Sequence, residues 1–476
     1  MSAMPVVLWT DGLVFLLMAL IGAFVLYASR HEHMRAPWRR VVRSRVGVAT
    51  IVVLGFYVVV GLLDTVHFRL ALERQGDDKG DDSAETRYSP EVLSLLDLAL
   101  SGLRERQEKT YSAPFATHLF VKEAIEQPDG TLVREFPRLE YGGAHLEDPT
   151  RQRGFDIAWR AARGALQGLV IWVALATGIL WLIARSRGET PAAARAAILA
   201  GRTPIPWRTA LLMLGIMLVL SAVAGELALK YHILGTDKVG EDVFYQTLKS
   251  IRTGLLIGTL TTLVMLPAAV LLGIMAGYFR GWVDDVIQYL YTTLNSIPGV
   301  LLIAAAILLL QVYMSNNADD FASLVERADL RLLFLVLILG VTSWTGLCRL
   351  LRGEALKLRE VDYVQASTAL GVGHFTLIGR HILPNVMHIV LITLVLDFSG
   401  LVLAEAVLSY INIGVDPTMN SWGNMINSAR LELARDPVVW WSLTAAFLFM
   451  FALVLAANLF ADVVRDAFDP RLKSAR

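Results

Sequence analysis

The chain has 476 residues, of which 55% are hydrophobic and 18% charged, and its formal net charge at pH 7 is zero. A mean hydropathy of +0.53 is too high for an ordinary soluble enzyme, and the balanced charge gives no reason to expect a nucleic-acid partner. The single cysteine, Cys348, excludes an internal disulfide and a cysteine-based zinc site. The sequence has no metal-binding HExxH motif, and the lack of any Gly-Lys pair excludes a Walker-type phosphate loop.

The apolar residues come in blocks of about 20, the length of a helix that crosses a bilayer. The first block lacks the basic start and the small-residue cleavage site of a signal peptide. The fold class is therefore an all-α polytopic membrane protein embedded in a lipid bilayer. The predicted spans are nine: 6–28, 46–64, 165–184, 209–229, 253–276, 286–312, 331–349, 386–411 and 438–461.

Arginine predicts the orientation of these spans. The stretches 30–45 and 185–208 are rich in arginine and poor in acid, so the positive-inside rule places both in the cytoplasm. With an odd number of spans, the N-terminus is then periplasmic and the C-terminus cytoplasmic. The acid-containing connectors 230–250, 313–330 and 412–437 fall outside.

One sizeable soluble segment, residues 65–160, lies between the second and third spans on the outer side. Residues 73–87 are predicted to form a solvated linker. Leucines at spacings of three and four predict a helix within 90–109, and 118–136 reads as two short strands around Pro-Asp-Gly. We expect a small extramembrane α+β domain.

A polar insert between two apolar blocks, "YVQASTALGVGHFTLIGRHILPN" (Tyr363–Asn385), carries the strongest functional signal. Good helix formers precede it, Gly371 suits the left-handed end of a helix, and Pro384 suits the start of the next one. Small residues at Ala366 and Ser367 leave a shallow surface for close packing. The pattern predicts a short helix, a sharp turn, a second short helix and then a span. Such a rigid protrusion would transmit the movement of a cytoplasmic partner into the membrane.

The insert resembles the Glu-Ala-Ala loop of bacterial ABC-importer permeases: Glu-Ala-Ala, three residues, Gly, nine residues, Ile, one residue, Leu-Pro. This chain departs from that pattern with Gln365 for the glutamate, Ser367 for the second alanine and His381 for the isoleucine. The ending "RHILPN" is typical of the dipeptide, oligopeptide and nickel branch of these permeases. A glutamine carries no charge for a salt bridge to an ATPase, but its amide still hydrogen-bonds, so we expect docking to persist.

Three further stretches resemble the same branch. Residues 232–255 are similar to its Gly-Thr-Asp-x-x-Gly-Arg-Asp signature, with Glu241 replacing the arginine. Residues 403–426 are similar to its Glu-x-x-Leu-Ser-Phe-Leu-Gly and Ser-Trp-Gly run, and "DAFDPRL" at 466–472 is similar to its usual end. The resemblance covers about residues 205–473.

The resemblance implies a six-span permease core with an N-terminal extension of three spans. The expected divisions are two transmembrane helices (1–64), a periplasmic soluble domain (65–160), a third transmembrane helix with a cytoplasmic linker (161–204), and the core (205–476) with its coupling loop (350–385).

The resemblance also implies a function: the transmembrane subunit of an ATP-driven importer that moves peptides or peptide-like solutes across the bacterial inner membrane by alternating access. Implied partners are a homologous second permease, two cytoplasmic ATPases and a periplasmic substrate-binding protein. This chain would itself bind no cofactor and no metal and would not be an enzyme, since ATP and Mg²⁺ belong to the ATPases. The residues expected to dock the ATPase are Tyr363, Gln365, Ala366, Ser367, Leu370 and Gly371.

Three polar residues inside predicted spans are candidates for the translocation path. Asp397 and Glu405 lie eight residues apart, on a similar side of one helix, and ionisable groups at membrane depth tend to face water or a partner. Alternatively, Glu405 lies near the outer interface and Asp397 bonds to a neighbouring helix. Asn295 precedes Pro298, whose bend is either a gate hinge or an ordinary kink of a membrane helix.

Two competing functions belong to other classes. An ion-gradient-driven secondary transporter would usually show repeated interrupted helices, and the halves of this chain show no convincing self-similarity. A membrane-anchored sensor using the outer domain would not need the cytoplasmic insert. Recovery of the chain with two ATPases and a second permease would separate the first function from these two.

Overall fold

The computed structural model describes residues 3–72, 88–126, 132–317 and 323–468. The expected linker at 73–87, the Pro-Asp-Gly turn and most of the final "DAFDPRL" stretch lie outside these residues. The elements are, in chain order, β1 (Ala3–Val6), α1 (Trp9–Arg30), α2 (Glu32–Arg43), α3 (Arg45–Thr65), β2 (His67–Leu70), β3 (Leu93–Ser94), α4 (Leu95–Ala99), α5 (Ser101–Arg104), β4 (Glu123–Glu126), β5 (Leu132–Glu135), α6 (Pro149–Arg187), α7 (Pro191–Leu199), α8 (Trp207–Ala228), α9 (Val243–Phe279), α10 (Trp282–Ser296), α11 (Gly299–Asn316), α12 (Leu324–Arg359), α13 (Asp362–Ala369), α14 (His374–Leu377), the π-helical turn η2 (Ile378–Ile382), α15 (Leu383–Tyr410), α16 (Trp422–Glu432) and α17 (Trp441–Phe468).

The polytopic helical fold predicted from the sequence is confirmed. Within the described residues, nine helical segments are long and apolar enough to cross a membrane, the number expected from the apolar blocks. Several of them extend well beyond the apolar block that announced them: α6 has 39 residues, α9 has 37 and α12 has 36. A helix of 36 residues is about 54 Å long, against a hydrocarbon core of about 30 Å, so these helices carry polar ends out of the bilayer.

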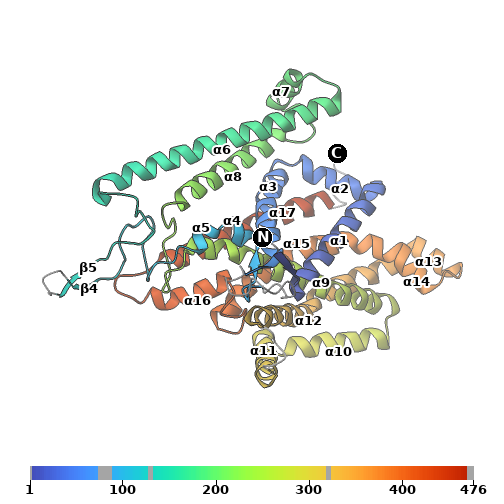
Figure 1. Cartoon of the computed structure of the whole chain (residues 1–476). Helices are drawn as coiled ribbons and strands as arrows, with labels where there is room; N and C mark the ends of the chain where they lie inside the picture. The colour runs from blue at the N-terminus through green and yellow to red at the C-terminus, as the bar shows by residue number, and fades with distance from the viewer. Residues whose placement is uncertain (1–2, 73–87, 127–131, 318–322, 469–476) are drawn as a thin grey trace, which may run out of the picture.

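The predicted span 286–312 is wrong as a single helix. The structure divides it into α10 and α11, and Ile297 between them has an extended backbone with φ −91° and ψ 127°. Pro298 explains the break, because it lacks an N–H and disfavours helical geometry in the residue before it. Figure 1 shows the chain turning sharply between the two helices.

Polar residues mark the starts of the long helices. Asp148 caps α6 through its side chain, Asp242 accepts from the backbone N–H groups of Phe244 and Tyr245 at the start of α9, and Ser323 caps α12. These caps satisfy N–H groups that have no partner inside the helix. The three caps therefore fix the residues at which these helices begin.

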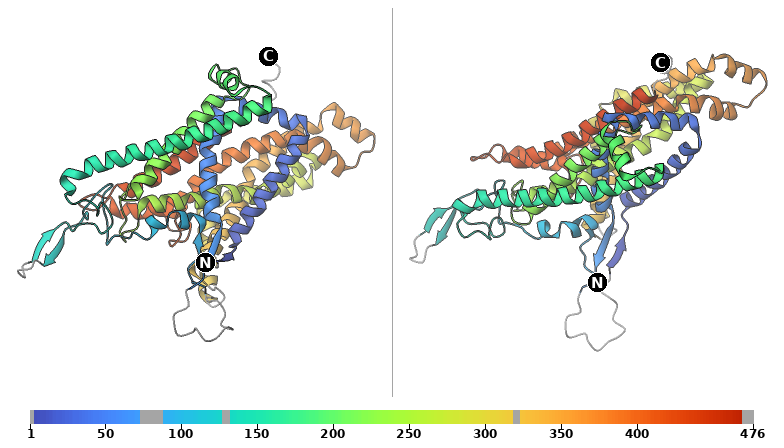
Figure 2. Two further views of the ribbon diagram at one scale, coloured as in Figure 1. Left: turned by 45° about the horizontal axis from the view of Figure 1, so that its top comes forward. Right: turned by 90° about the horizontal axis from the view of Figure 1, so that it is seen from above.

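The molecule has two distinct ends. Figure 1 shows the β4–β5 hairpin, α5 and α16 at one end of the long helices and α13 with α14 at the opposite end. Both views of Figure 2 keep the hairpin and the α13–α14 turn far apart. The two ends are the ones that the sequence predicts to be periplasmic and cytoplasmic.

The three N-terminal spans are interleaved with the predicted core. α3 packs against α8 on one side and against α9 and α17 on another, while α8 packs mainly against α6 and α3. The α6–α8 contact is close because glycines line it: a Cβ at Gly168 would lie 2.7 Å from the Cα of Val219. Helix α3 therefore separates the first helix of the predicted core from the others.

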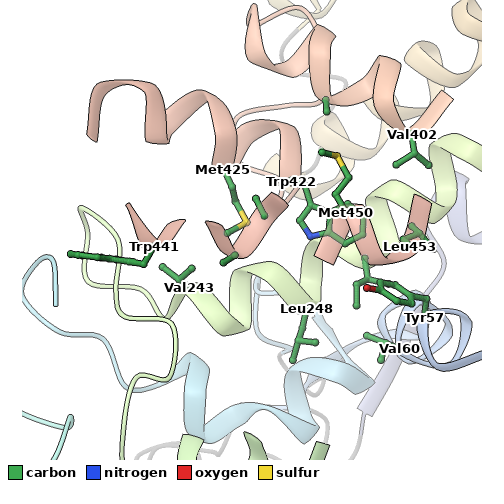
Figure 3. Close-up of a cluster of buried hydrophobic side chains, with 14 of the residues drawn as sticks. Tyr57, Val60, Val243, Leu248, Val402, Trp422, Met425, Trp441, Met450 and Leu453 are labelled. Atoms are coloured by element: carbon green, nitrogen blue, oxygen red, sulfur yellow. The ribbon is translucent and has the colours of Figure 1, made fainter. Parts of the chain in front are cut away.

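A shared hydrophobic cluster shows the same interleaving (Figure 3). Tyr57 and Val60 of α3 belong to it together with Leu248 of α9 and Trp422 of α16, and the indole of Trp422 is 1% exposed. The Trp422 Nε1 donates to the carbonyl of Thr247 at 3.2 Å, which satisfies its polar atom inside the cluster. Burial of this apolar surface stabilises the extension and the core as one unit.

The outer segment contains the expected strands and a shorter helical part than expected. β4 and β5 pair antiparallel, with Glu123 opposite Glu135. The helix predicted within 90–109 is two short helices, because Ser94 caps α4 only at Leu95 and Leu100 leaves helical geometry with ψ 18°. β1, β2 and β3 form a small antiparallel sheet that ties the N-terminus to the residues after α3.

Candidate functional site: the cytoplasmic loop, the membrane cavity and the junction with the extension

The insert forms a helix, a glycine turn and a second helix. α12 ends at Arg359, and α13 follows after two residues. Gly371 has φ +77°; its N–H donates to the carbonyl of Thr368, and the N–H of Val372 donates to that of Ser367. This pair of bonds is the Schellman motif, in which a left-handed glycine ends a helix. The prediction that Gly371 ends a helix in the left-handed conformation is confirmed by this geometry.

The end of the insert differs from the prediction in one respect. Pro384 lies in the first turn of α15, as predicted. The helical segment nevertheless runs without interruption from His374 to Tyr410, so the second short helix is continuous with α15. The π-helical turn η2 lies directly before it, and the N–H of Leu383 donates to the carbonyl of Ile378 five residues back. A π turn shifts the helical hydrogen bonds by one residue just before the proline, which has no N–H to donate. The second helix of the insert is thus a rigid continuation of a span.

Buried side chains and ion pairs anchor the insert. Val364 is 1% exposed and Leu377 is fully buried, and both belong to a cluster with Leu351 of α12 and Ile274 of α9. Arg280, just after α9, forms an ion pair of 2.7 Å with Glu360. These contacts hold the short helices against the C-terminal ends of the long helices α9 and α12.

The six predicted docking residues lie on α13 and at the turn that follows it. Tyr363, Gln365, Ala366, Leu370 and Gly371 are exposed and Ser367 is half-buried; their role in docking stays a prediction. Sequence reasoning missed the strongest exposed apolar group beside them, Phe375, which is 88% exposed next to Leu370 at 85%. An aromatic residue in a polar turn between glycines was the signal that could have found it, since exposed apolar patches mark interaction sites.

Gln365 contacts a carboxylate of its own chain. Its Nε2 donates to the carbonyl and to the side-chain Oε2 of Glu360, at 3.3 Å each. A glutamate at 365 would set two carboxylates side by side, which is unfavourable for both. The departure from the family pattern at 365 therefore matches the presence of Glu360.

A cavity of about 450 Å³ lies between α9, α12 and α15 at membrane depth, and Asp397 is one of its lining residues. Ser343 of α12 and Thr393 of α15 also line it. Asn295, exposed at the end of α10, accepts from the Oγ1 of Thr345 at 3.1 Å and so lies beside the same part of α12. Thr345 is not among the described residues that line the cavity, so the described contacts do not bring Asn295 and Asp397 together in one site.

Glu405 lies elsewhere. It is 1% exposed, accepts from the Oγ of Ser409 at 2.7 Å, and is so close to α16 that a Cβ at Gly423 would be 2.9 Å from its Oε1. It is absent from the described lining of the Asp397 cavity. The described geometry makes Glu405 a contact between α15 and α16.

A buried polar network joins the extension to the core, and sequence reasoning missed it. Arg252 of α9 donates to Asp11 of α1 at 2.7 Å, and Asp11 in turn contacts His67 Nδ1 at 2.8 Å. The backbone N–H of Thr10 donates to Asp329 of α12 at 3.1 Å, and its hydroxyl donates to the same carboxylate. An aspartate near the end of an apolar block was the available signal, because a charge in a membrane needs a partner.

A second part of the network surrounds Lys249. Its Nζ lies 2.6 Å from Asp64 of α3 and 2.9 Å from Asp97 of α4, and the hydroxyl of Tyr245 donates to Asp97 at 2.6 Å. Burial opposes the charge of Asp97, but Lys249 and the Tyr245 hydrogen bond outweigh it, so its pKa is lowered. Each of these three contacts joins the extension or the outer segment to α9.

A third cluster holds the outer segment to the connector that carries the Gly-Thr-Asp signature. His232 contacts Asp242 at 2.7 Å and Glu108 at 3.3 Å, and Glu108 accepts from three successive backbone N–H groups, 140–142. Burial disfavours the imidazolium, but the hydrogen bonds that it donates to Asp242 and Glu108 outweigh this effect and raise the pKa of His232 to about 9. Burial opposes ionisation of Glu108 too, but its bonds to His232 and the backbone lower its pKa to about 2.

These features define a multi-pass membrane protein with a rigid helical turn that projects beyond its long helices, which is typical of membrane permease subunits. The family described as "Binding-protein-dependent transport system inner membrane component" matches residues 269–474. The chain is 32% identical over 245 residues to the glutathione transport system permease protein GsiD of Pectobacterium atrosepticum, covering 51% of this chain and 74% of that protein. The chain therefore belongs to this family of ABC-importer permeases of the inner membrane.

Two further relatives come from the peptide branch. The dipeptide transport system permease protein DppC of Bacillus subtilis is 29% identical over 242 residues, which cover 51% of this chain and 69% of that protein. The oligopeptide transport system permease protein OppC of Mycobacterium tuberculosis is 31% identical over 245 residues, which cover 52% of this chain and 78% of that protein. Each match spans about half of this chain.

Proposed function

We propose that this permease is the transmembrane subunit of an ATP-driven importer for peptides or peptide-like solutes. The observation that carries the proposal is the exposed apolar tip of the insert, Leu370 and Phe375, mounted on the fully buried Leu377. An exposed apolar pair on a rigid support is suited to burial in a partner. The named substrates of the relatives, dipeptides, oligopeptides and glutathione, give the solute class.

In this proposal two cytoplasmic ATPases bind ATP and Mg²⁺ and dock on the insert, while a homologous second permease packs beside this chain. A periplasmic binding protein delivers solute to the end of the molecule that carries α16. In the same orientation, the N-terminus is periplasmic and the C-terminus is cytoplasmic. ATP-driven movement of α13 is transmitted through Val364 and Leu377 to the ends of α9 and α12. Alternating access then exposes the path beside Asp397 and Asn295 to each side in turn.

The test is ATP-dependent uptake of a labelled peptide by proteoliposomes that hold the whole complex. We expect uptake only with ATP, and loss of both uptake and ATPase co-purification in Leu370→Asp/Phe375→Asp. The control is Leu199→Asp, which places one such charge on an exposed leucine of α7. Uptake driven by an ion gradient without ATP, or ATPase recovery unchanged in the double variant, would refute the proposal.

A further inference from the structure

Two adjoining cavities open at the outer end of the molecule, around the C-terminal end of α16. Their volumes are about 300 and 290 Å³, and both are lined by Lys238, Ser428 and Glu432. Tyr111 of the outer segment closes one of them. Helix α16 lies at the end of the molecule opposite α13 and α14 (Figure 1), and the size of the two cavities suits a small-molecule site.

Glu432 is the unusual group between the cavities. It is 3% exposed, and its Oε1 accepts from the hydroxyl of Tyr111 at 3.4 Å. Its other oxygen, Oε2, is buried and has no hydrogen-bond partner among the described residues. Burial, followed by the charge of Asp237, raises the pKa of this carboxyl. Buried polar atoms nearly always have partners, so a donor is missing here.

The two cavities differ in charge. Besides Lys238 and Glu432, which line both, one cavity is lined by the cations Arg430 and Arg435 and the other by the carboxylates of Asp237 and Glu241. Both arginines are held over aromatic rings, Arg435 at 4.9 Å from the ring centre of Tyr111 and Arg430 at 5.4 Å from that of Tyr410. Their guanidinium groups are thereby positioned to receive an anion, and the acidic side of Glu432 to receive a cation.

We propose that these cavities form a reception site for short unblocked peptides, with the peptide ammonium at Glu432 Oε2 and its carboxylate at Arg430 and Arg435. A peptide zwitterion supplies both charges, and its ammonium is the donor that Glu432 lacks. The site rests on the proposed transport of peptides and extends it by naming free termini as the recognised groups. Because Tyr111 belongs to the outer segment, the N-terminal extension contributes directly to recognition.

The experiment measures binding of three probes to the full-length chain in lipid nanodiscs: tri-alanine, N-acetyl-tri-alanine and tri-alanine amide. In the wild type we expect each blocked probe to bind at least tenfold more weakly than tri-alanine. Glu432→Gln should bind tri-alanine no better than the N-acetyl probe, and Arg435→Gln should no longer distinguish tri-alanine from its amide. Asp436→Asn, an exposed neighbour, is the matched control and should behave as the wild type.

Equal binding of all three probes to the wild type, or full discrimination in folded Glu432→Gln, would overturn the site. ATP-driven peptide uptake separates this failure from failure of the proposed function. If uptake persists while the probes are not distinguished, the site is wrong and the transport proposal stands. If tri-alanine is bound selectively but never transported, the site stands and the transport proposal fails.

Discussion

At the scale of single residues, Gln365 shows how one departure from a family pattern is matched by its neighbour. Gln365→Glu would bring a second carboxylate to the Oε2 of Glu360, now 3.3 Å from the amide. In the isolated chain we expect a loss of less than about 1 kcal/mol in the local stability of the α12–α13 turn, because both groups are exposed. Faster hydrogen exchange over residues 360–371 at low salt would report it.

The double variant Glu360→Gln/Gln365→Glu is the control for that prediction. It separates the two carboxylates again but also removes the exposed ion pair of Glu360 with Arg280, so hydrogen exchange should be slower than in Gln365→Glu and close to the wild-type rate. If Gln365→Glu alone leaves the exchange unchanged, the contact with Glu360 does not hold the turn.

The His232 cluster predicts a pH dependence of the outer junction. The pKa of His232 rises from 6.5 to about 9. The stabilisation from the charged imidazole is therefore complete below pH 6.5 and is lost as pH rises through 9. Glu108, with a pKa lowered from 4.5 to about 2, contributes fully above pH 4.5 and loses its contribution as pH falls through 2. Junction stability should therefore be greatest between these limits, about pH 4.5 to 6.5.

Thermal unfolding of the purified chain at pH 6 and pH 9 measures this dependence. The loss on raising the pH should be on the order of 3 kcal/mol at most, and His232→Gln should largely remove it. The exposed His118→Gln is the matched control and should keep it. An identical pH dependence in His232→Gln would show that another group is responsible.

At the scale of elements, α9 and α12 form the most closely packed pair of long helices, and glycine makes the contact possible. A Cβ at Gly277 of α9 would lie 2.5 Å from the carbonyl oxygen of Arg352. Because backbone has to move, Gly277→Ala should destabilise the chain by about 1–3 kcal/mol. A lower thermal unfolding temperature in detergent would show this.

Gly353 supplies the control for that contact. It lies in α12, and a Cβ added to it would have nothing within 4 Å. Gly353→Ala should therefore be neutral or stabilising, because alanine favours a helix more than glycine does. Equal destabilisation by both variants would refute the close α9–α12 contact.

Elements were predictable where local sequence decides them. Apolar blocks located the spans, and Gly371 marked the end of α13 because its left-handed backbone is a local property. The break at Pro298 was read as a bend, since a sequence alone does not tell whether neighbouring helices hold a kinked helix together. The continuity of the second short helix with α15 was missed, because the π turn η2 keeps the chain helical up to Ile382 and Pro384 then lies in the first turn of α15.

At the scale of the whole molecule, the extension and the core are joined through buried charges. Asp11→Asn would remove the partner 2.7 Å from the Arg252 guanidinium, whose side chain is 6% exposed. Loss of one member of a buried ion pair is expected to cost about 3–5 kcal/mol. We expect a strongly lowered thermal stability and poor yield of the purified protein.

An exposed ion pair provides the comparison. Glu32 and Arg39 lie 3.1 Å apart with side chains 72% and 47% exposed, and Glu32→Gln should change stability by no more than about 1 kcal/mol. If Asp11→Asn were as mild, the network would not join the two parts.

The arrangement of the whole molecule was the least predictable level. The family pattern begins at about residue 205, so the extension was expected as a separate group of spans. Contacts such as Tyr57 with Trp422, 6.5 Å between ring centres, join residues hundreds of positions apart. Periodicity and composition describe each helix alone, and which helices become neighbours depends on the shape of all of them.

The position of α3 has a consequence for how the chain is made. Because synthesis proceeds from the N-terminus, α1 and α3 emerge before α9, which carries the countercharges of Asp11 and Asp64. Until α9 has been inserted, the two carboxylates have to remain in contact with water at the membrane–water interface. More than half of the chain therefore has to leave the ribosome before these charges are paired. Helices α8, α9 and α17 then pack around α3, which was synthesised before them.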